Sequence, residues 1–315
     1  MINYSFIHQL LHEIFLGNKL IKKSIFELEK IIFLKKNNIK NNKHIFITGM
    51  PRSGTTALLN VLNKKTDLCS LKYKNMPFVM GPNISKFFKS KKLIKSERYH
   101  KDNIFIDLES PESFDEIFFL NYKNNIVFEE LKNFVSLVLS SYHKERYLSK
   151  NNNNYLRINN LKSIFPNSAF IIPVREPLQH SFSLLTQHNN FIKLQKKNNF
   201  VLKYMNYLGH YEFGLGHKSW FKPINYKNKF TINYWLEQWY LYYNYVYKNY
   251  SNNESCLIFA YEELINRKLL NSLANFAEID KMEKNDFKIS IKKIKLNFDK
   301  NLYFKSKNLY DNVFS

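Results

Sequence analysis

The sequence is poor in glycine, cysteine and arginine, and it has no long hydrophobic run. Its 315 residues contain seven glycines and two cysteines, Cys69 and Cys256, and two cysteines make neither a disulfide framework nor a tetrahedral metal site. We expect free thiols, a reducing compartment and no bound metal. The apolar stretch near the start is broken at His12, Glu13 and Lys19 and has no basic segment before it. We therefore predict neither a membrane-spanning helix nor a secretory leader, and we expect a cytoplasmic protein.

The charge is one-sided, because acidic residues are few for the number of basic ones. The formal net charge is +22 at pH 7, and only six of the 48 basic residues are arginine. The abundance of lysine and asparagine indicates a genome rich in A and T, which would put much of the lysine on solvated faces without a function. The rest of the charge favours an anionic partner: a phosphorylated substrate, an acidic glycan, nucleic acid or a membrane surface. Charge alone does not choose among them.

Apolar segments alternate with helical patterns along the chain. Strands are expected at 44–49, 69–73, 168–174 and 256–261, and helices at 22–34, 55–65, 111–120, 128–148, 232–250 and 262–279, with a further helix opened by Pro177. This alternation predicts an α/β fold in three layers, with a mostly parallel sheet covered by helices on both faces.

A single domain is expected, with a helical extension at 1–42, a core at 43–280 and a tail at 281–315. The extension should begin with an amphipathic helix whose apolar face is formed by Phe6, Leu10, Leu11, Ile14 and Phe15.

The segment ITGMPRSGTTALLN, at 47–60, has the outline of a phosphate-binding loop. Gly49 and Gly54 match the two glycines of G-x-x-x-x-G-K-[ST], and an apolar strand and a helix flank them as that motif requires. Thr55 and Thr56 follow Gly54, so the lysine that reaches the β- and γ-phosphates is absent. The loop is therefore poorly suited to a triphosphate with magnesium.

Other groups of this loop can still hold an anion. Backbone N–H groups at the helix N-terminus bind phosphate, and Ser53, Thr55 and Thr56 offer hydroxyl donors. Arg52 adds a planar guanidinium suited to an oxyanion. The sequence predicts a site for one phosphate and for a further group within reach of Arg52. The alternative is a tight strand-to-helix turn without a ligand.

A second motif, FIIPVREPLQHSFS, follows about 120 residues later. It places Arg175 at the end of a strand, Pro177 at the start of a helix and Ser183 within that helix. A strand-end arginine can bind phosphate through two hydrogen bonds, and the proline fixes where the helix begins. The alternative for Arg175 is a surface ion pair with Glu176.

The two motifs together resemble those of sulfotransferases that use 3′-phosphoadenosine 5′-phosphosulfate (PAPS) as sulfuryl donor. The resemblance covers roughly 43–279 and implies the P-loop-like fold of that family. It implies that Arg52 and the loop contact the 5′-phosphate and the sulfuryl group. It also implies that Arg175 and Ser183 bind the 3′-phosphate, and that no metal is required. A contact with the nucleotide from the C-terminal part, common in the family, is not identifiable here.

The resemblance also suggests residues for the transfer itself. Lys150, in RYLSKNNNNYLRINNLKSIFPNSAF, matches a family lysine near the sulfate, although one more solvated lysine is the alternative. A hydroxyl acceptor requires a general base, which relatives place between the loop and this lysine. The segment at 96–119 supplies histidine and carboxylate candidates there: His100, Asp102, Glu109, Glu112 and Glu116.

Among these candidates we predict His100 first, because an imidazole titrates near neutral pH, and Glu112 second. The alternatives are a solvated histidine and a glutamate in the first turn of a helix capped by Ser110.

The sequence thus favours a bacterial PAPS-dependent sulfotransferase that yields 3′,5′-ADP. The expected acceptor is a hydroxyl group on a cell-surface or exported glycan. A nucleotide or small-molecule kinase with a degenerate loop is the first alternative, and the missing lysine and the Arg175/Ser183 pair speak against it. A basic protein that binds nucleic acid or a membrane surface is the second. Charge is its only support, since no nucleic-acid-binding motif is recognised.

Overall fold

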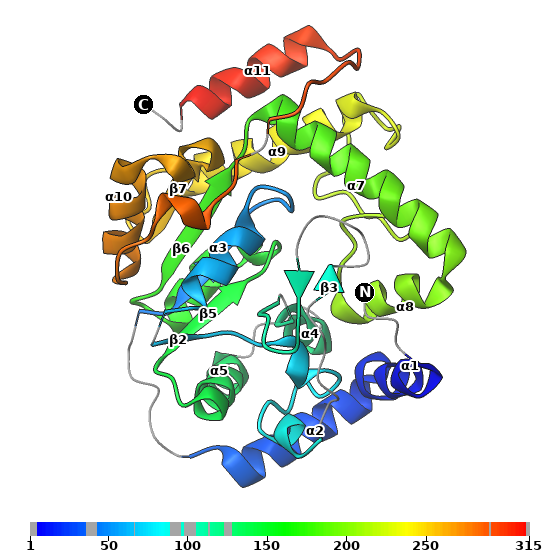
Figure 1. The fold of residues 1–315 in the computed structure, drawn as a ribbon, viewed down its shortest axis with the longest axis vertical. Helices are drawn as coiled ribbons and strands as arrows, with labels where there is room; N and C mark the ends of the chain where they lie inside the picture. Colours follow the sequence, from blue (N-terminus) through cyan, green and yellow to red (C-terminus); the bar gives the residue numbers. More distant parts are fainter. Residues whose placement is uncertain are drawn as a thin grey trace.

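The computed structural model describes residues 5–35, 43–65, 67–88, 96–97, 105–112, 114–122, 128–289 and 291–312. Its centre is a parallel sheet in the order β2-β5-β1-β6-β7 (Figure 1). The strands are β1 Ile45–Ile47, β2 Leu68–Cys69, β5 Arg146–Lys150, β6 Ala169–Val174 and β7 Cys256–Ala260. A separate antiparallel pair is formed by β3 Ser96–Glu97 and β4 Phe105–Ile106.

The helices pack on both faces of the sheet and extend beyond it. They are α1 Phe6–His12, α2 Lys19–Phe33, α3 Thr55–Leu62, α4 Glu116–Asn121, α5 Phe128–Tyr142, α6 Ile158–Ile164, α7 Pro177–Lys197, α8 Asn199–Leu208, α9 Ile232–Tyr250, α10 Arg267–Ala277 and α11 Lys300–Asp311. Short helical turns are η1 Glu13–Gly17, η2 Tyr73–Asn75, η3 Ile84–Phe87, η4 Asn154–Leu156, η5 Tyr261–Ile265 and η6 Lys284–Asp286. None of the helices in the described ranges is long and apolar enough to cross a bilayer.

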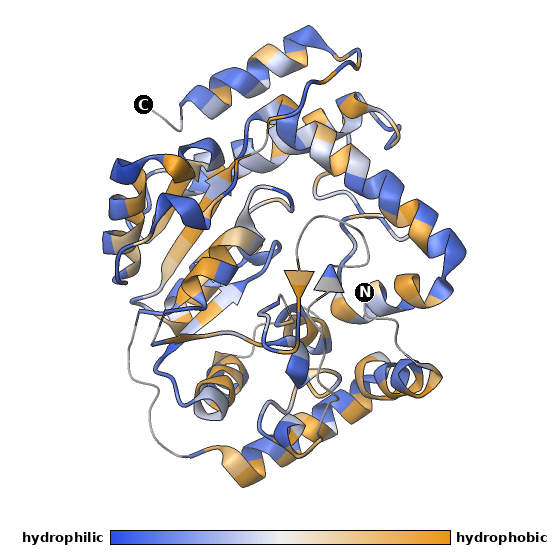
Figure 2. Ribbon diagram, in the orientation of Figure 1, coloured by the Kyte–Doolittle hydropathy of each residue, from blue (hydrophilic) through white to orange (hydrophobic). Residues whose placement is uncertain are grey.

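β1, β6 and β7 are apolar on both sides, as is typical of parallel strands between two helical layers, whereas β5 also carries Arg146, Ser149 and Lys150 (Figure 2). Ile45 and Ile47 of β1 belong to a core cluster shared with α3 and α10. Phe46, between them, belongs to the larger cluster that includes α5, α7 and α9. The predicted fold class is therefore confirmed, and the alternation along β1 separates the two layers.

Several expected elements are also confirmed, among them α9 and the opening of α7 at Pro177. The helix expected at 128–148 is confirmed as far as Tyr142 and is wrong in its last six residues. α5 ends at Tyr142, where His143 adopts a left-handed conformation with φ +52°, and Lys144 N–H bonds the Leu139 carbonyl at 3.1 Å. This closure is usually made by glycine, so the sequence gives no sign of it. The residues that follow form β5, which we did not expect.

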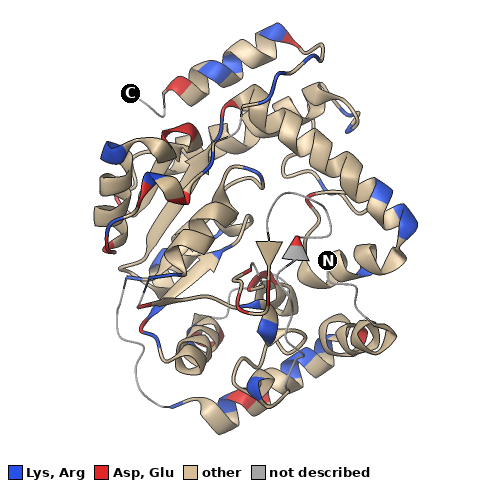
Figure 3. Cartoon of the chain, viewed as in Figure 1, with Lys and Arg blue, Asp and Glu red and all other residues tan. Residues whose placement is uncertain are grey.

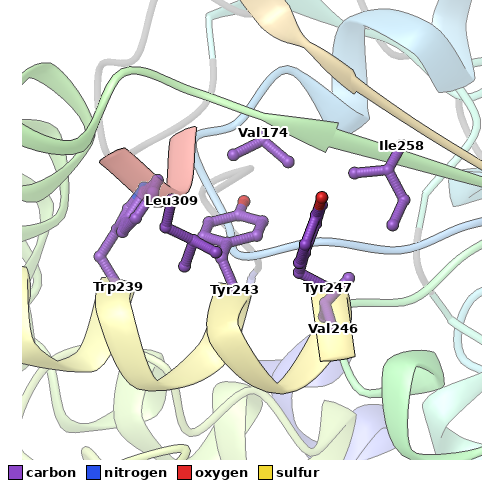
Figure 4. A pocket seen from close by; sticks show the side chains of 7 residues that line it. All are labelled: Val174, Trp239, Tyr243, Val246, Tyr247, Ile258 and Leu309. Atoms are coloured by element: carbon purple, nitrogen blue, oxygen red, sulfur yellow. The ribbon is translucent and has the colours of Figure 1, made fainter. Parts of the chain in front are cut away.

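The two ends of the molecule carry the terminal helices (Figure 1). α11 packs on α9 and α7, while α2 packs on α4 and α5 at the opposite end. Side chains from β6, β7, α9 and α11 enclose a small apolar cavity beneath α11, as Figure 4 shows: Val174, Trp239, Tyr243, Val246, Tyr247, Ile258 and Leu309. The tail after 280, in which the sequence shows no motif, contains the short turn η6 and the helix α11.

Candidate active site

Four neighbouring strands end at one edge of the sheet and bring the predicted motifs together. β1 is followed by the loop at 48–54, β5 ends at Lys150, β6 is followed by Arg175, and β7 is followed by Tyr261. β1 lies between β5 and β6, and Lys150 pairs with Ile47 in register. Ligands of open parallel sheets bind at such carboxyl ends. The segments that were far apart in sequence therefore meet where a ligand is expected.

The loop after β1 is fixed by steric contact as well as by hydrogen bonds. Gly54 has φ +96°, and a Cβ atom there would lie 2.3 Å from Cδ2 of Tyr261. Only glycine fits this position. Arg52 has φ +76°, a conformation that non-glycine residues rarely adopt and that clusters at functional sites. The strained backbone at Arg52 is held in place by the neighbours described next.

Two residues from the second motif hold the loop through its carbonyl groups. His180 of α7 is fully buried, and its Nε2 lies 2.8 Å from the Pro51 carbonyl oxygen. Burial lowers the pKa of His180 to about 3, so the ring is neutral and Nε2 donates the hydrogen bond. Arg175 donates from Nη1 to the Arg52 carbonyl at 3.2 Å. The carbonyl oxygens of Pro51 and Arg52 are therefore both bonded by side chains of the second motif.

The same motif also meets the Arg52 side chain. Arg52 Nε donates to Ser183 Oγ at 3.3 Å, and Ser183 lies one turn after His180 on α7. The guanidinium of Arg175 lies over the Tyr261 ring, 5.6 Å from its centroid. Arg52, Arg175 and Ser183 thus form one cluster of donors, as their spacing in the sequence predicted. The roles assigned to them stay predictions.

The hydroxyl groups of the loop differ in how they are used. Ser53 is fully buried, and its Oγ donates to the Met50 carbonyl at 2.8 Å, so this hydroxyl closes the loop from inside. Thr55 is buried at the first turn of α3, and Thr56 is partly exposed. Ser53, one of the predicted hydroxyl donors, therefore spends its hydrogen bond within the loop, whereas Thr55 and Thr56 lie at the start of α3.

Lys150 and Glu112 form a second polar cluster beside β1. Lys150 Nζ lies 3.8 Å from Glu112 Oε1, and both side chains are less than a tenth exposed. Tyr73 donates from its hydroxyl to Glu112 Oε2 at 3.1 Å. A buried carboxylate next to an ammonium group and a phenol can take up a proton while its charge is balanced. Glu112, our second candidate for the general base, thus lies beside Lys150.

His100 and Asp102 lie outside the described residues, so the structure gives no position for them. The interpretation of Glu112 as a first-turn helix residue is wrong. α4 begins at Glu116, and Ser110 bonds Asp107 instead of capping a helix, with Oγ to Oδ1 at 2.8 Å. Glu112 lies in an extended segment, and its own backbone N–H donates to the Leu71 carbonyl at 3.1 Å. This pairing with the residues after β2 turns Glu112 toward Lys150.

A buried network anchors the Glu112 segment to the segment around Lys150. Arg157 donates to both carboxylate oxygens of Glu116, at 2.7 and 2.9 Å, and its guanidinium lies 3.9 Å from the centroid of the Phe119 ring. Asn151 donates to Glu116 Oε2 at 2.8 Å, and Ser149 donates to Asp115. Burial raises the pKa of Asp115 to about 6. The network ties residues on both sides of Lys150 to residues just after Glu112.

Sequence reasoning missed His180, Tyr261, Arg157 and Asp115, and took the strand leading to Tyr261 as scaffold. The spacing of His180 and Ser183, three apart on one helix face, was the available signal for a second residue beneath the loop. No local pattern pointed to the Arg157 network, because its members come from separate segments. Among the described residues, no three His, Cys, Asp or Glu side chains gather as a metal site requires.

The sequence and the fold are similar to those of known proteins. A family model described as the sulfotransferase family matches residues 44–234, more than half of the chain. The structure is similar to sulfotransferase STF1 from Mycobacterium tuberculosis H37Rv, with a TM-score of 0.52 and 11% identity, covering 87% of this chain and 77% of that one. Sulfotransferase STF9 from Mycobacterium avium gives a TM-score of 0.49 and 11% identity, covering 99% and 79%. At these identities the likeness to STF1 supports the fold. No curated protein matches the sequence significantly.

Proposed function

The chain belongs to the sulfotransferase family, and we propose that it moves the sulfuryl group of PAPS to a hydroxyl group of an acceptor. The observation that carries this proposal is the meeting of Arg52, Arg175 and Ser183 at the strand ends. All three come from the two motifs that resemble the nucleotide-binding motifs of the family. We call this cluster, with Gly54 and His180, the donor side of the site.

The donor side fits a doubly phosphorylated nucleotide in its chemistry. Arg52 and Arg175 bring two guanidinium groups to one place, and guanidinium groups bind phosphate through paired, charge-assisted hydrogen bonds. Arg52 and the N-terminus of α3 suit the 5′-phosphosulfate, while Arg175 and Ser183 suit the 3′-phosphate. The absence of the loop lysine is consistent with a ligand that carries no γ-phosphate.

Glu112, Lys150 and Tyr73 form what we call the acceptor side. The oxygen of the acceptor hydroxyl attacks the sulfur atom, and Glu112 accepts the proton of that hydroxyl. The new oxygen–sulfur bond forms while the bond from sulfur to the phosphate oxygen breaks, and 3′,5′-ADP leaves. Lys150 and Arg52 hold positive charge next to the oxygens on which negative charge develops. Tyr73 donates to Glu112 and keeps one carboxylate oxygen oriented. No metal takes part in this scheme.

The acceptor belongs, in this proposal, to a glycan destined for the cell surface or for export and modified in the cytoplasm. The supporting features are the strong net charge of +22, which suits an acidic glycan, and the polar side chains around Lys150. Among these, Asn152 donates to Glu212 Oε1 at 3.0 Å and so brings the loop after α8 next to the site.

Thermal unfolding with nucleotides tests the donor assignment. A ligand that binds only the folded state raises the melting temperature, so 3′,5′-ADP should stabilise the protein more than 5′-AMP does. Arg175→Ala should abolish the difference between the two nucleotides. Arg267→Ala is the matched control, because Arg267 is exposed at the start of α10, far along the chain from both motifs.

Two outcomes would replace the proposal. Stabilisation by ATP with Mg²⁺, and none by 3′,5′-ADP, would favour a kinase with a degenerate loop. Salt-dependent binding of DNA without any nucleotide effect would favour a basic nucleic-acid-binding protein, because affinity from phosphate contacts falls steeply with salt.

A further inference from the structure

The two N-terminal helices expose apolar side chains on the side that faces away from the protein. In α1 and η1 these are Phe6, Ile7, Leu10 and Ile14, between 38% and 79% exposed. Of the apolar face predicted from the sequence, Phe6, Leu10 and Ile14 are exposed, whereas Leu11 and Phe15 are half-buried. The residues that pack fully inward are His12 and Leu16. A helix face of this kind normally faces the core. Its exposure therefore requires a reason outside the monomer.

The next helix repeats this arrangement. α2 buries Phe26 and Glu29 against the protein and exposes Leu20 and Ile31 at 75% and 81%, with Leu28 and Ile32 beside them at 49% and 57%. Eight of the twenty exposed large apolar side chains in the described part of the chain lie between 6 and 32. Scattered apolar residues need no explanation, but a concentration of this kind marks an interaction surface.

Aromatic contacts connect the two helices through a third element. Phe87 and Phe88, at and just after the end of η3, are 75% and 56% exposed. The Phe88 ring stacks on Phe78 at 4.3 Å, and Phe78 contacts Phe15 of η1 at 4.5 Å. The Phe87 ring lies 6.4 Å from Phe33 at the end of α2. These contacts link η1, η3 and the end of α2, and we call the exposed apolar side chains of α1, η1, α2 and η3, together with Phe88, the N-terminal apolar surface.

Basic residues surround this surface, and its acidic residues are neutralised. Lys19, Lys23 and Lys35 are exposed on or beside α2, whose ribbon carries blue lysine segments in Figure 3. The exposed acids Glu13 and Glu27 form ion pairs, with Lys203 at 3.2 Å and with Lys30 at 3.0 Å. Lys86, directly before the Phe87–Phe88 pair, is exposed as well. The chain as a whole carries +22.

We propose that the N-terminal apolar surface docks the protein on an anionic lipid bilayer. Apolar side chains from helices that lie along a membrane enter the boundary between head groups and acyl chains, while lysines beside them attract acidic head groups. The combination of exposed Phe, Leu and Ile with lysine matches both requirements. A protein partner would need only the apolar part. This docking is independent of the donor and acceptor sides, which belong to the sheet edge.

Vesicle co-sedimentation tests the apolar contribution. The full chain should bind phosphatidylcholine vesicles that contain phosphatidylserine, and should bind weakly to phosphatidylcholine alone. Leu20→Ser combined with Ile31→Ser should reduce binding at least about tenfold, because serine offers far less apolar area to the bilayer than leucine or isoleucine does. The matched control is Ile224→Ser with Phe304→Ser, which removes two side chains exposed elsewhere at 67% and 63%. Equal melting temperatures of all variants verify folding.

The charge contribution needs its own pair of variants. Lys19→Glu with Lys23→Glu should remove most of the preference for phosphatidylserine, by about fivefold for each lysine. Lys196→Glu with Lys197→Glu, at the exposed end of α7, makes the same change of charge away from the surface and should have a much smaller effect.

Three results would overturn the proposal. The first is a wild-type chain that does not bind acidic vesicles. The second is equal binding by the Leu20/Ile31 variant and its control. The third is a wild-type dimer in solution that becomes a monomer in the Leu20/Ile31 variant without any vesicle binding, which would assign the surface to contact between copies of the chain.

Discussion

On the donor side of the sheet edge, a neutral histidine and an arginine donate hydrogen bonds to backbone carbonyl groups. Around the acceptor side, buried carboxylates accept hydrogen bonds from side chains of other segments. His180 and Arg175 donate to the carbonyls of Pro51 and Arg52. In the network that anchors the acceptor side, Glu116 accepts from Arg157, and Asp115 accepts from Ser149. The donor side is therefore fixed mainly by shape, and the acceptor side mainly by charge.

The difference follows from what each side must hold. A site for an anionic nucleotide requires donors that point outward, so the loop carbonyls must be satisfied from behind. A site that takes up a proton requires a carboxylate, and that carboxylate must be kept apart from further negative charge. Glu112 has Lys150 and Tyr73 for this purpose, while Asp115 and Glu116 are turned into the network beneath.

The largest expected effect is on catalysis and concerns the acceptor side alone. Glu112→Gln keeps the size of the side chain and removes the base, so kcat for release of 3′,5′-ADP from PAPS with a panel of glycans should fall about 10²–10⁴-fold. The stabilisation by 3′,5′-ADP should not change. Glu109→Gln is the control, because Glu109 lies on the same segment but is 61% exposed and paired with Lys72 and Lys74. A variant at Glu112 with wild-type kcat would exclude it as the base.

The charge-based construction of the acceptor side predicts a large loss of stability. Arg157→Leu leaves the buried carboxylate of Glu116 without its partner, and the free energy of unfolding should fall by about 3–5 kcal/mol. Arg267→Leu, at an exposed position, should change it by less than about 0.5 kcal/mol. Urea unfolding measures both. A small effect at Arg157 would mean that Asn151 and water satisfy Glu116 without it.

The shape-based construction of the donor side predicts a different response. Gly54→Ala should cost about 1–2 kcal/mol for the left-handed backbone and about 1–3 kcal/mol for the contact with Tyr261. It should also weaken binding of 3′,5′-ADP, because the loop shifts. Gly216→Ala is the control, since a Cβ there meets nothing closer than 3.4 Å. Equal stability of the two variants, measured by urea unfolding, would show that the loop adapts.

The effects of pH on stability should have opposite signs on the two sides. The pKa of His180 falls from 6.5 to about 3 on folding, so its contribution is complete above 6.5 and is lost as the pH falls toward 3. The pKa of Asp115 rises from 3.8 to about 6, so its contribution is complete below 3.8 and is lost as the pH rises through 6.

Two variants measure these slopes. Relative to the wild type, His180→Gln should lose stability as the pH rises between about 3 and 6.5, because the wild type gains it there and glutamine does not titrate. Asp115→Asn should gain stability relative to the wild type between about 3.8 and 6. Unfolding free energies at several pH values give both differences. Slopes of the same sign would contradict the contrast between the two sides.

The three motif residues of the donor side could be picked out from the sequence, whereas His180 and the arrangement of the acceptor side could not. Arg52, Arg175 and Ser183 lie in two short motifs, each set by one strand end, and parallel strands bring such ends together. Glu112 lies in an extended segment that looked helical, and Lys150 ends a strand that looked like the continuation of α5. Glu112 and Lys150 come together through pairing between segments that are distant in sequence, and no local sequence pattern indicates that pairing.

The sequence by itself determined the α/β class, the phosphate loop without its lysine, and the arginine and serine that meet it. It did so because strand periodicity, glycine positions and helix starts are local properties of the chain. The tertiary structure decided which carboxylate stands beside Lys150, and that His180 supports the loop. It also decided that Phe6, Leu10 and Ile14 of the apolar face expected near the N-terminus are exposed. Each of these depends on burial, and burial is a property of the packed chain, since it is set by which segments cover one another.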